Sequence, residues 1–445
     1  MCNGPIMGKL ISFALPLCAS SVLQLMFNAV DIIVVGRFTG KEALAAVGAT
    51  SALINLFVNL FVGISLGANV MTARYYATDA DEKVSQVVHT SLTFALISGF
   101  VMIFVGFFGA FPALTIMGTP ENVIADSVRY MKIYFCGMPF FMLYNYGAAI
   151  LRAVGDTKRP LIFLVISGIV NAGLNVFLVV EFSLGVAGVA IATVISQCIS
   201  CCLTLACLFK TESSYKIRLK KLSINGKCLL SVLRVGLPAG IQSMVISLSN
   251  SMLQSAVNTF GDTAMAGYTA ANNIFGFLYV SVNSVSQACM SFTSQNFGAK
   301  KPKRMDRVLL YCVIIQIIMP LIMGSAVYLF APELIGIYNK DTEVIACGVQ
   351  VFAYTTVTYF ICGLMDLFPG ALRGMGRSSV PMILSVLGTV GTRIVWVYGL
   401  FPTHRSLNFL FISYPASWII TLAMQVVCFI FVRKSVHKKL SLQAA

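Results

Sequence analysis

Long apolar stretches recur along the whole chain, and they restrict its fold more than any other feature of the sequence. A helix needs about 20 mostly apolar residues to cross ~30 Å of hydrocarbon, whereas the alternating pattern of a membrane β-barrel is not seen. Because twelve such stretches can be counted, we predict an all-α integral membrane protein with twelve transmembrane helices. The stretches cover approximately residues 10–36, 44–73, 86–111, 130–151, 160–181, 185–209, 229–259, 264–297, 307–331, 347–372, 380–400 and 408–432.

Composition and charge support a membrane location. Hydrophobic residues make up 58% of the chain and charged residues 11%, a balance that soluble domains do not normally show. If the N-terminus is cytoplasmic, 24 of the 31 Lys and Arg residues fall in cytoplasmic ends and loops. Because positively charged loops stay inside, we predict a plasma-membrane protein with both termini in the cytoplasm. The net charge of +15 then reflects inner loops facing anionic lipid, so membrane lipid rather than nucleic acid is the expected partner.

The sequence also repeats itself. "LRAVGDTKRP" (151–160) matches "LRGMGRSSVP" (372–381) at Leu, Arg, Gly and Pro with a shift of 221 residues. Near the start, "FALPLCASSVLQLMFNAV" (13–30) parallels "VGLPAGIQSMVISLSNSM" (235–252) with a shift of 222 residues. Twelve spans therefore divide into two halves of six.

Six spans is an even number, so both halves enter the membrane from the same side. They are predicted to form two six-helix bundles related as parallel repeats about an axis along the membrane normal. We assign residues 1–209 to the N-terminal bundle, 210–228 to a cytoplasmic linker and 229–445 to the C-terminal bundle. Two such bundles around a central cleft are a common transporter plan, although this plan alone does not establish transport.

Several kinds of chemistry lack support in the sequence. There is no Gly-x-x-x-x-Gly-Lys loop followed by Ser or Thr, no nucleophile motif and no zinc-binding helix motif. His89, His404 and His437 stand far apart, and the thirteen cysteines lie mostly in apolar segments without the spacing of a disulfide framework or a zinc site. We expect no enzymatic activity, no metal and no cofactor, so an ion gradient of protons or sodium must supply the energy.

Asp31 and Asp366 are the two acids, of sixteen in the chain, that fall inside predicted spans. A carboxylate in the membrane costs ~2.5 to 3.5 kcal/mol on insertion scales, so it usually faces a cavity or a partner. Asp31 lies ~9 Å below Arg37 at ~1.5 Å per residue, in the outer half of the membrane. Asn28 and Gln24 precede Asp31 by three and seven residues on the same helix face, and we expect this face to line a cavity.

Asn171 and Asn175 form a second polar stripe, four residues apart on the fifth predicted helix, and Thr193 stands early in the sixth. These side chains can hydrogen-bond a protonated Asp31 or bind a cation together with it. The alternative is that they only tie helices to one another, which is a common use of Asn and Thr in membranes.

Asp366 lies seven residues before Arg373 on the tenth predicted helix, and the repeat places Asn145 at the corresponding position. A position that is polar in both halves suggests inward-facing side chains, which makes Asp366 a candidate coupling acid and Asn145 a candidate substrate-binding residue. Asp366 can also reach Arg373 or a water-filled inner mouth. Arg393 is the one deep basic residue and a possible partner of Asp366, although the two differ in depth.

The order and spacing of several segments resemble those of the multidrug and toxic compound extrusion (MATE) transporters, with the DinF-like branch the most similar. The segments are "LPLCASSVLQLMFNAVDIIVVGRF", "ALAAVG", "LRAVGDTKRP" and "ALRGMGRSSVP". The resemblance covers nearly the whole chain. It implies an antiporter, expected as a monomer, that expels bulky organic cations while admitting protons or sodium ions.

The resemblance also implies roles for single residues. Asp31, within "NAVDIIVVG", occupies the place of the coupling acid of the N-terminal half. Gln24 and Asn28 stand where relatives line the substrate cavity, and Asn171 and Thr193 stand where relatives surround the acid.

Two departures from the family pattern affect the mechanism. Several relatives carry a second acid where this chain has Asn175. Other branches carry an acid on the seventh helix, and this chain lacks it, because Ser249, Asn250 and Gln254 are uncharged. Coupling by Asp31 alone, or by Asp31 together with Asp366, is therefore favoured.

Two other classes of protein compete with this reading. A flippase for lipid-linked precursors or polysaccharides shares the two-bundle plan, but such proteins tend to have more helices and more basic cavity residues. A channel or a signalling receptor fits a duplicated six-helix half less well. Gradient-dependent, saturable transport would separate these classes.

Overall fold

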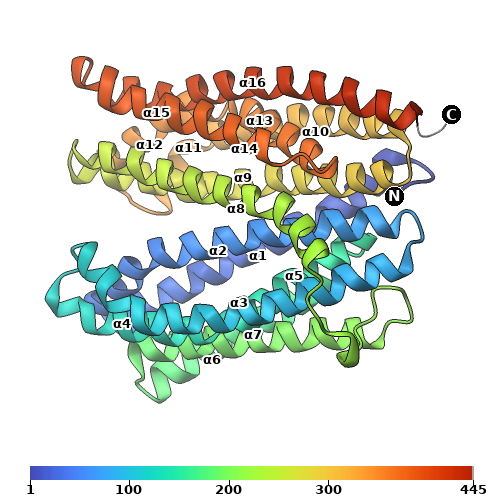
Figure 1. Cartoon of the computed structure of the whole chain (residues 1–445). Coiled ribbons are helices and arrows are strands. Elements are labelled where there is room, and N and C mark those ends of the chain that lie inside the picture. Colours follow the sequence, from blue (N-terminus) through green and yellow to red (C-terminus); the bar gives the residue numbers. More distant parts are fainter. Residues whose placement is uncertain (443–445) are drawn as a thin grey trace. The chain divides into compact units, whose positions relative to one another are not determined.

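The computed structural model describes residues 1–442, and that range is helical with no strand (Figure 1). The first half contains seven α-helices and one π-helical segment. They are α1 (Ile6–Phe38), α2 (Lys41–Tyr76), α3 (Asp81–Ile116), α4 (Glu121–Cys136), α5 (Met138–Val154), α6 (Lys158–Val176), the π-helical η1 (Phe177–Glu181) and α7 (Gly185–Lys210).

The second half follows a short connection that contains one 3-10 turn, η2 (Leu219–Lys221). Its helices are α8 (Gly226–Asn258), α9 (Asp262–Gly298), α10 (Pro302–Leu329), α11 (Ala331–Gly336), α12 (Thr342–Thr355), α13 (Tyr359–Gly374), α14 (Ser379–Ser385), the π-helical η3 (Val386–Gly391), α15 (Thr392–Ile394), the π-helical η4 (Val395–Leu400), the 3-10 turn η5 (Phe401–Thr403) and α16 (Leu407–Leu442).

The two halves are built from corresponding elements. The helices α8, α9, α10, α12, α13, α14 and α16 begin 220 to 222 residues after α1, α2, α3, α4, α5, α6 and α7, respectively. Six spans in each half follow when the broken helices α4–α5 and α12–α13 each count as one span, and when the interrupted stretch from α14 to η4 counts as another. The predicted twelve-helix architecture with two six-helix repeats is confirmed.

Length and composition support most of these spans directly. Within residues 1–442, nine helices are long and apolar enough to cross a membrane, and the pair α12–α13, bent by 53°, makes a tenth. The remaining two spans are assigned through the repeat. The pair α4–α5 corresponds to the bent pair α12–α13, and α9 corresponds to α2. The helix α9 is 37 residues long, but its buried face carries many serines that lower its hydropathy.

Helix contacts divide the chain into two compact units. One unit is Ala19–Leu237, and the other combines Met1–Cys18 with Pro238–Ala445, of which residues 443–445 lie outside the described range. Both α1 and α8 therefore contribute to both units. The division of the sequence into 1–209, 210–228 and 229–445 follows the repeat and stays a prediction.

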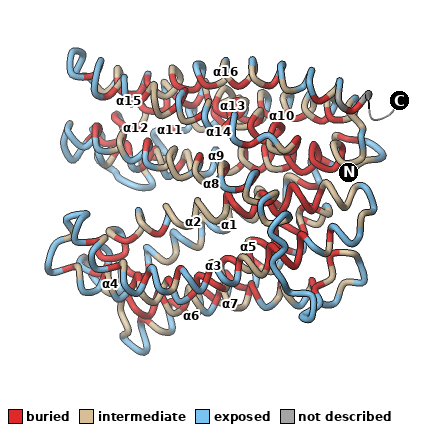
Figure 2. Tube along the Cα trace, viewed as in Figure 1, coloured by how far each residue is buried: buried red, intermediate tan, exposed pale blue. Residues whose placement is uncertain are grey.

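Each unit has its own apolar interior, and its outer faces are apolar as well. Figure 2 shows buried residues along the faces where helices of one unit meet, with exposed residues at the helix ends. Large side chains such as Phe104, Phe108, Ile169 and Phe431 remain exposed on span surfaces. A helix that is apolar on its outer face suits a lipid surrounding, because its backbone polar groups are satisfied internally.

The connection after α7 is anchored on α3. The backbone N–H of Arg218 donates to Nε2 of His89 over 2.9 Å, and the backbone N–H of Asn225 donates to Oγ1 of Thr90 over 3.2 Å. His89 is buried, and its Nδ1 lies 2.6 Å from the carbonyl oxygen of Ser85. This part of the basic linker therefore has a defined place on the first unit.

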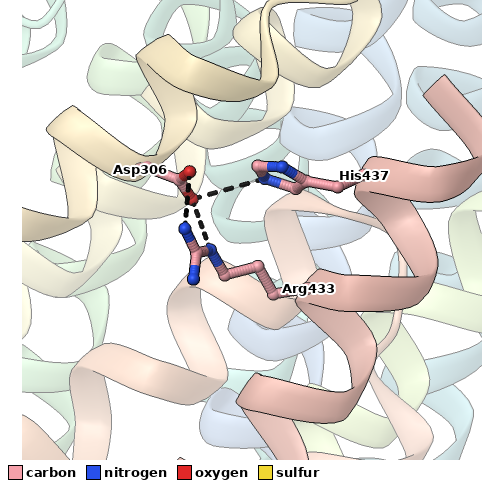
Figure 3. A network of polar contacts seen from close by, with 3 residues as sticks. All are labelled: Asp306, Arg433 and His437. Carbon is pink, nitrogen blue, oxygen red and sulfur yellow. Dashed lines mark hydrogen bonds and ion pairs between the residues drawn. The ribbon is translucent and has the colours of Figure 1, made fainter. Parts of the chain in front are cut away.

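A polar network ties the beginning of α10 to the end of α16 (Figure 3). Nε and Nη2 of Arg433 donate to the two carboxylate oxygens of Asp306 over 2.8 and 2.9 Å. Nε2 of His437 lies 3.4 Å from one of the same oxygens. Since α16 also packs along α13, this network fixes the end of the helix rather than its course.

Candidate functional site

A close contact between α1 and α6 sets the geometry around the acid of the first helix. The ring of Phe27 lies directly on Gly168, so closely that a Cβ atom at Gly168 would overlap the ring. Leu164, one turn earlier on α6, belongs to the same apolar cluster. Glycine is required here because two membrane helices approach closely only where one of them lacks a side chain.

This contact places two polar stripes opposite each other. Asp31 lies one turn beyond Phe27, and Asn171 and Asn175 lie one and two turns beyond Gly168. Nδ2 of Asn175 donates to a carboxylate oxygen of Asp31, and it also lies 3.3 Å from Oδ1 of Asn171. Three of the predicted coupling residues are thus brought together on two helices of one unit.

The environment of the three residues is largely closed. Asn171 and Asn175 are buried, and Asp31 is partly buried. Among the described residues, Oδ1 of Asn175 has no hydrogen-bond partner. A buried acceptor without a donor costs about 1–3 kcal/mol, and this oxygen is chemically able to accept a hydrogen bond or to bind a cation.

Two tyrosines of α4 complete this site, and sequence reasoning did not bring them to it. Tyr130 and Tyr134 stack on each other with ring centroids 6.2 Å apart, and both lie near enough to interact electrostatically with Asp31. Their spacing of four residues puts them on one helix face. That spacing was the available signal, but helical spacing does not say which helix the shared face contacts, so the two rings were not assigned to Asp31.

The other predicted residues of the first half lie apart from this hydrogen-bonded group. Oγ1 of Thr193 donates to the carbonyl of Val189 over 2.9 Å, and Nδ2 of Asn145 donates to the carbonyl of Phe141 over 2.8 Å, each within its own helix. Gln24 and Asn28 are exposed on α1. No hydrogen bond from these four predicted residues to Asp31 is found in the described part of the chain, and their roles stay predictions.

Asp366 has its own surroundings in the second half. The hydroxyl group of Tyr279 hydrogen-bonds its carboxylate, and Oγ of Ser286 donates to its backbone carbonyl over 2.7 Å. Arg373 is near enough for an electrostatic interaction, but its Nη2 donates to Oε1 of Gln242 over 2.7 Å. The role of Asp366 in coupling stays a prediction.

Arg393 does not pair with Asp366, contrary to the possibility that we considered from the sequence. Its Nη1 lies 2.7 Å from Oδ1 of Asn250 and 3.4 Å from Oγ of Ser249, both on α8. Its guanidinium carbon lies 4.8 Å from the ring centroid of Tyr414. Depth along a helix does not reveal which neighbour a side chain faces, and here Arg393 faces α8 and α16.

No group of three or more His, Cys, Asp or Glu residues with the arrangement of a metal site occurs within residues 1–442. The polar sites of the two halves instead place Asp31, Asp366 and Arg393 beside amides, hydroxyl groups and tyrosine rings. Such sites, on twelve spans arranged as two parallel repeats, define a class of proteins, the helical membrane transporters with internal repeats.

Comparison with known proteins identifies the particular group within that class. The chain belongs to the MatE family, whose model matches residues 16–177 in the first half and 238–398 in the second. The MATE resemblance predicted from the sequence is thereby confirmed, and the flippase alternative is not favoured. Assignment to the DinF-like branch stays a prediction.

Individual relatives span nearly the whole chain. It is 28% identical over 420 residues to the probable multidrug resistance protein YoeA of Bacillus subtilis, covering 93% of this chain and 91% of that protein. It is 24% identical to the probable multidrug resistance protein NorM of Thermotoga maritima, covering 87% and 84%. The fold matches a solved MATE structure in complex with MaL6 with a TM-score of 0.91, at 21% identity and with 98% of both chains covered.

Proposed function

We propose that this chain is an ion-coupled antiporter that exports cationic and amphipathic organic compounds, with Asp31 as its coupling carboxylate. The observation that carries the proposal is the group formed by Asp31, Asn175 and Asn171, in which a partly buried acid faces an amide with an unpaired oxygen. The names of the relatives support multidrug export, and the single carboxylate supports coupling at one site in this half.

The amide of Asn175 is suited to both protonation states of Asp31. An ionised carboxylate only accepts hydrogen bonds, and Nδ2 of Asn175 donates to it. When Asp31 takes up a proton, its new O–H group needs an acceptor, and the unpaired Oδ1 of Asn175 can supply one after rotation of the amide. That rotation also removes Nδ2 from Asn171, so protonation of Asp31 changes a hydrogen bond within α6 as well as the one between α1 and α6.

A sodium ion is the alternative coupling ion. Hard cations bind oxygen ligands, and the carboxylate of Asp31 with the amide oxygens of Asn171 and Asn175 provides such a set. In either case the ion neutralises Asp31, which removes its attraction for a cationic compound and favours release outside. Each charge that crosses the membrane is worth ~2.3 kcal/mol per 100 mV, so the gradient supplies the energy.

The direction of transport rests on the distribution of charge. Basic residues concentrated in the even-numbered connections favour cytoplasmic termini and a place in the plasma membrane. Asp31 then lies in the outer half of the membrane, where external protons or sodium ions reach it. We propose that the chain acts as a monomer and needs no cofactor besides the coupling ion.

Dye uptake into inverted vesicles tests this function. Collapse of the proton gradient and of the sodium gradient, each in a separate sample, identifies the coupling ion. Asp31→Asn should abolish gradient-dependent uptake, whereas Asp126→Asn, at an exposed acid of α4, should leave it unchanged. Uptake by Asp31→Asn at the rate of the unmodified protein would refute the proposal, and Asp366→Asn in parallel reports whether the second acid shares the coupling.

A further inference from the structure

A buried guanidinium group in the second half has no acidic partner among the described residues. Arg393 is 2% exposed and lies on α15, in the middle of the span from Ser379 to Thr403. In the described part of the chain, no carboxylate oxygen lies within 4.0 Å of it. A charged side chain inside a membrane span is costly and usually marks a site that binds something or a pathway.

The hydrogen bonds of Arg393 are incomplete. Of the five N–H donors that a guanidinium group carries, those on Nη1 reach Asn250 and Ser249, and the plane lies against the ring of Tyr414. Nε is buried and has no partner within residues 1–442. The guanidinium group is therefore held in place while its Nε–H donor makes no hydrogen bond to the described residues.

The main acceptor for Arg393 is the neutral amide oxygen of Asn250. Its Oδ1 accepts from Nη1 of Arg393 over 2.7 Å, yet the residue itself is exposed on α8. Because Asn250 is exposed, its amide can rotate toward solvent, and Nη1 of Arg393 is then free to donate to another acceptor.

The repeat gives this arrangement a counterpart of opposite charge. Asn250 corresponds to Asn28, which is also exposed and lies one turn before Asp31. In the first half the exposed asparagine is near an acid in the sequence, Asp31. In the second half the corresponding asparagine is in contact with a base, Arg393.

The helix around Arg393 is also irregular. The π-helical segments η3 (Val386–Gly391) and η4 (Val395–Leu400) enclose the short α15 on both sides. In the first half, the π-helical η1 (Phe177–Glu181) begins two residues after Asn175. Such segments are rare and occur frequently at functional sites, because they widen the helix and redirect its side chains.

We propose that Arg393 and Asn250 form a binding site for the carboxylate group of organic compounds that this protein transports. The planar guanidinium fork matches a carboxylate with two parallel hydrogen bonds, whereas a neutral ester lacks the negative charge and the pair of equivalent oxygens that this geometry needs. The site rests on the proposed export function and narrows its substrate class to compounds that join a carboxylate to an aromatic or cationic body.

A matched pair of dyes tests this site. Tetramethylrhodamine carries a free carboxylate, and its methyl ester lacks that charge and otherwise differs only by one added methyl group. Binding of both dyes to the purified full chain in detergent is measured by fluorescence polarisation, with no ion gradient present. Arg393→Gln should weaken binding of the acid about tenfold or more and change binding of the ester less than about twofold, as expected for loss of a charged hydrogen-bonded pair.

Two further variants control for folding and for charge. Arg405→Gln removes an exposed arginine from the same half and should bind both dyes as the unmodified protein does. Asn250→Asp keeps Arg393 but gives it a fixed carboxylate partner at an exposed position, so the preference for the acid should disappear even if Arg393→Gln does not fold.

Several outcomes would overturn the site. The first is an unchanged ratio of acid to ester binding in Arg393→Gln, and the second is an unchanged ratio in Asn250→Asp. The third is that added phosphatidylglycerol abolishes binding of the acid while the protein shows no preference for the acid over the ester. Because no gradient is used, the result is independent of whether Asp31 couples transport to an ion.

Discussion

The ring of Phe27 packs on Gly168, and the carboxylate of Asp31 meets Asn175 one to two helical turns further along the same two helices. The apolar contact thus determines how the polar residues of the two helices are aligned. If the two helices slid or separated by the size of a methyl group, Asp31 would lose its donor although no polar residue had changed. The position of the proposed coupling acid therefore depends on a glycine that itself carries no chemistry.

Gly168→Ala is expected to impair transport through this contact. The added Cβ would overlap the ring of Phe27, and overpacking of this kind typically costs about 1–3 kcal/mol. Gly173→Ala is the matched control, since a Cβ at this exposed position of α6 meets nothing within 4 Å. Initial rates of dye uptake and thermal unfolding of both variants measure the effect. Equal uptake by the two variants would show that the Phe27 contact does not position Asp31.

Asn175→Ala should reduce gradient-dependent uptake about tenfold or more, because a hydrogen bond to a charged group is worth about 1.5–3 kcal/mol. Asn171→Ala should have a smaller effect, since Asn171 reaches Asp31 only through Asn175. The comparison of initial uptake rates at saturating dye checks the order of the two effects. A larger loss in Asn171→Ala would mean that Asn171, not Asn175, is the direct partner of the acid.

His89→Ala should release the linker from α3. Because Nε2 of His89 accepts the backbone N–H of Arg218, the ring carries its hydrogen on Nδ1 and donates to Ser85, and the variant removes both bonds. Trypsin, added to inverted vesicles, should then cleave the linker near Arg218 several times faster. Thr93→Ala, which loses only a bond within α3, is the control and should be cleaved at the unmodified rate.

Arg433→Gln should lower the free energy of unfolding by at most about 1 kcal/mol, because exposed ion pairs contribute little. The side chains of Arg433 and Asp306 are 48% and 28% exposed, so salt screens their attraction. Thermal unfolding at low and at high salt concentration measures this, and the difference between variant and unmodified protein should shrink as salt is added. A large loss that persists at high salt would point to a structural role beyond the ion pair.

The spans and the repeat could be predicted from the sequence because they depend on the length of apolar runs and on residue identities at a fixed shift. The pairing of Asp31 with the stripe of Asn171 and Asn175 could also be anticipated, since each stripe is visible as helical spacing. The contact that aligns the stripes could not, because nothing in the sequence says that Gly168 faces Phe27 rather than lipid.

Other features were hidden for different physical reasons. The helix α4 (Glu121–Cys136) carries charged residues in its first half, so the fourth span was predicted to begin only at residue 130. Asp366 was considered as a partner of Arg393 because Arg393 is the one basic residue deep in a predicted span, although the two differ in depth. The π-helical segments on either side of Arg393 change the direction of side chains, and a regular count of residues along a helix cannot follow that change.

The first thirteen residues of α1 have a consequence for how the protein is made. Ile6, Leu10 and Phe13 pack with residues such as Phe292 and Val436, which the ribosome adds nearly 300 to more than 400 residues later. The beginning of the first helix to enter the membrane must therefore wait, covered by lipid or by the insertion machinery, until almost the entire polypeptide has emerged. A chain that stops after its first half would leave this apolar surface permanently without its partners, so the duplicated halves are not interchangeable as independently assembling pieces.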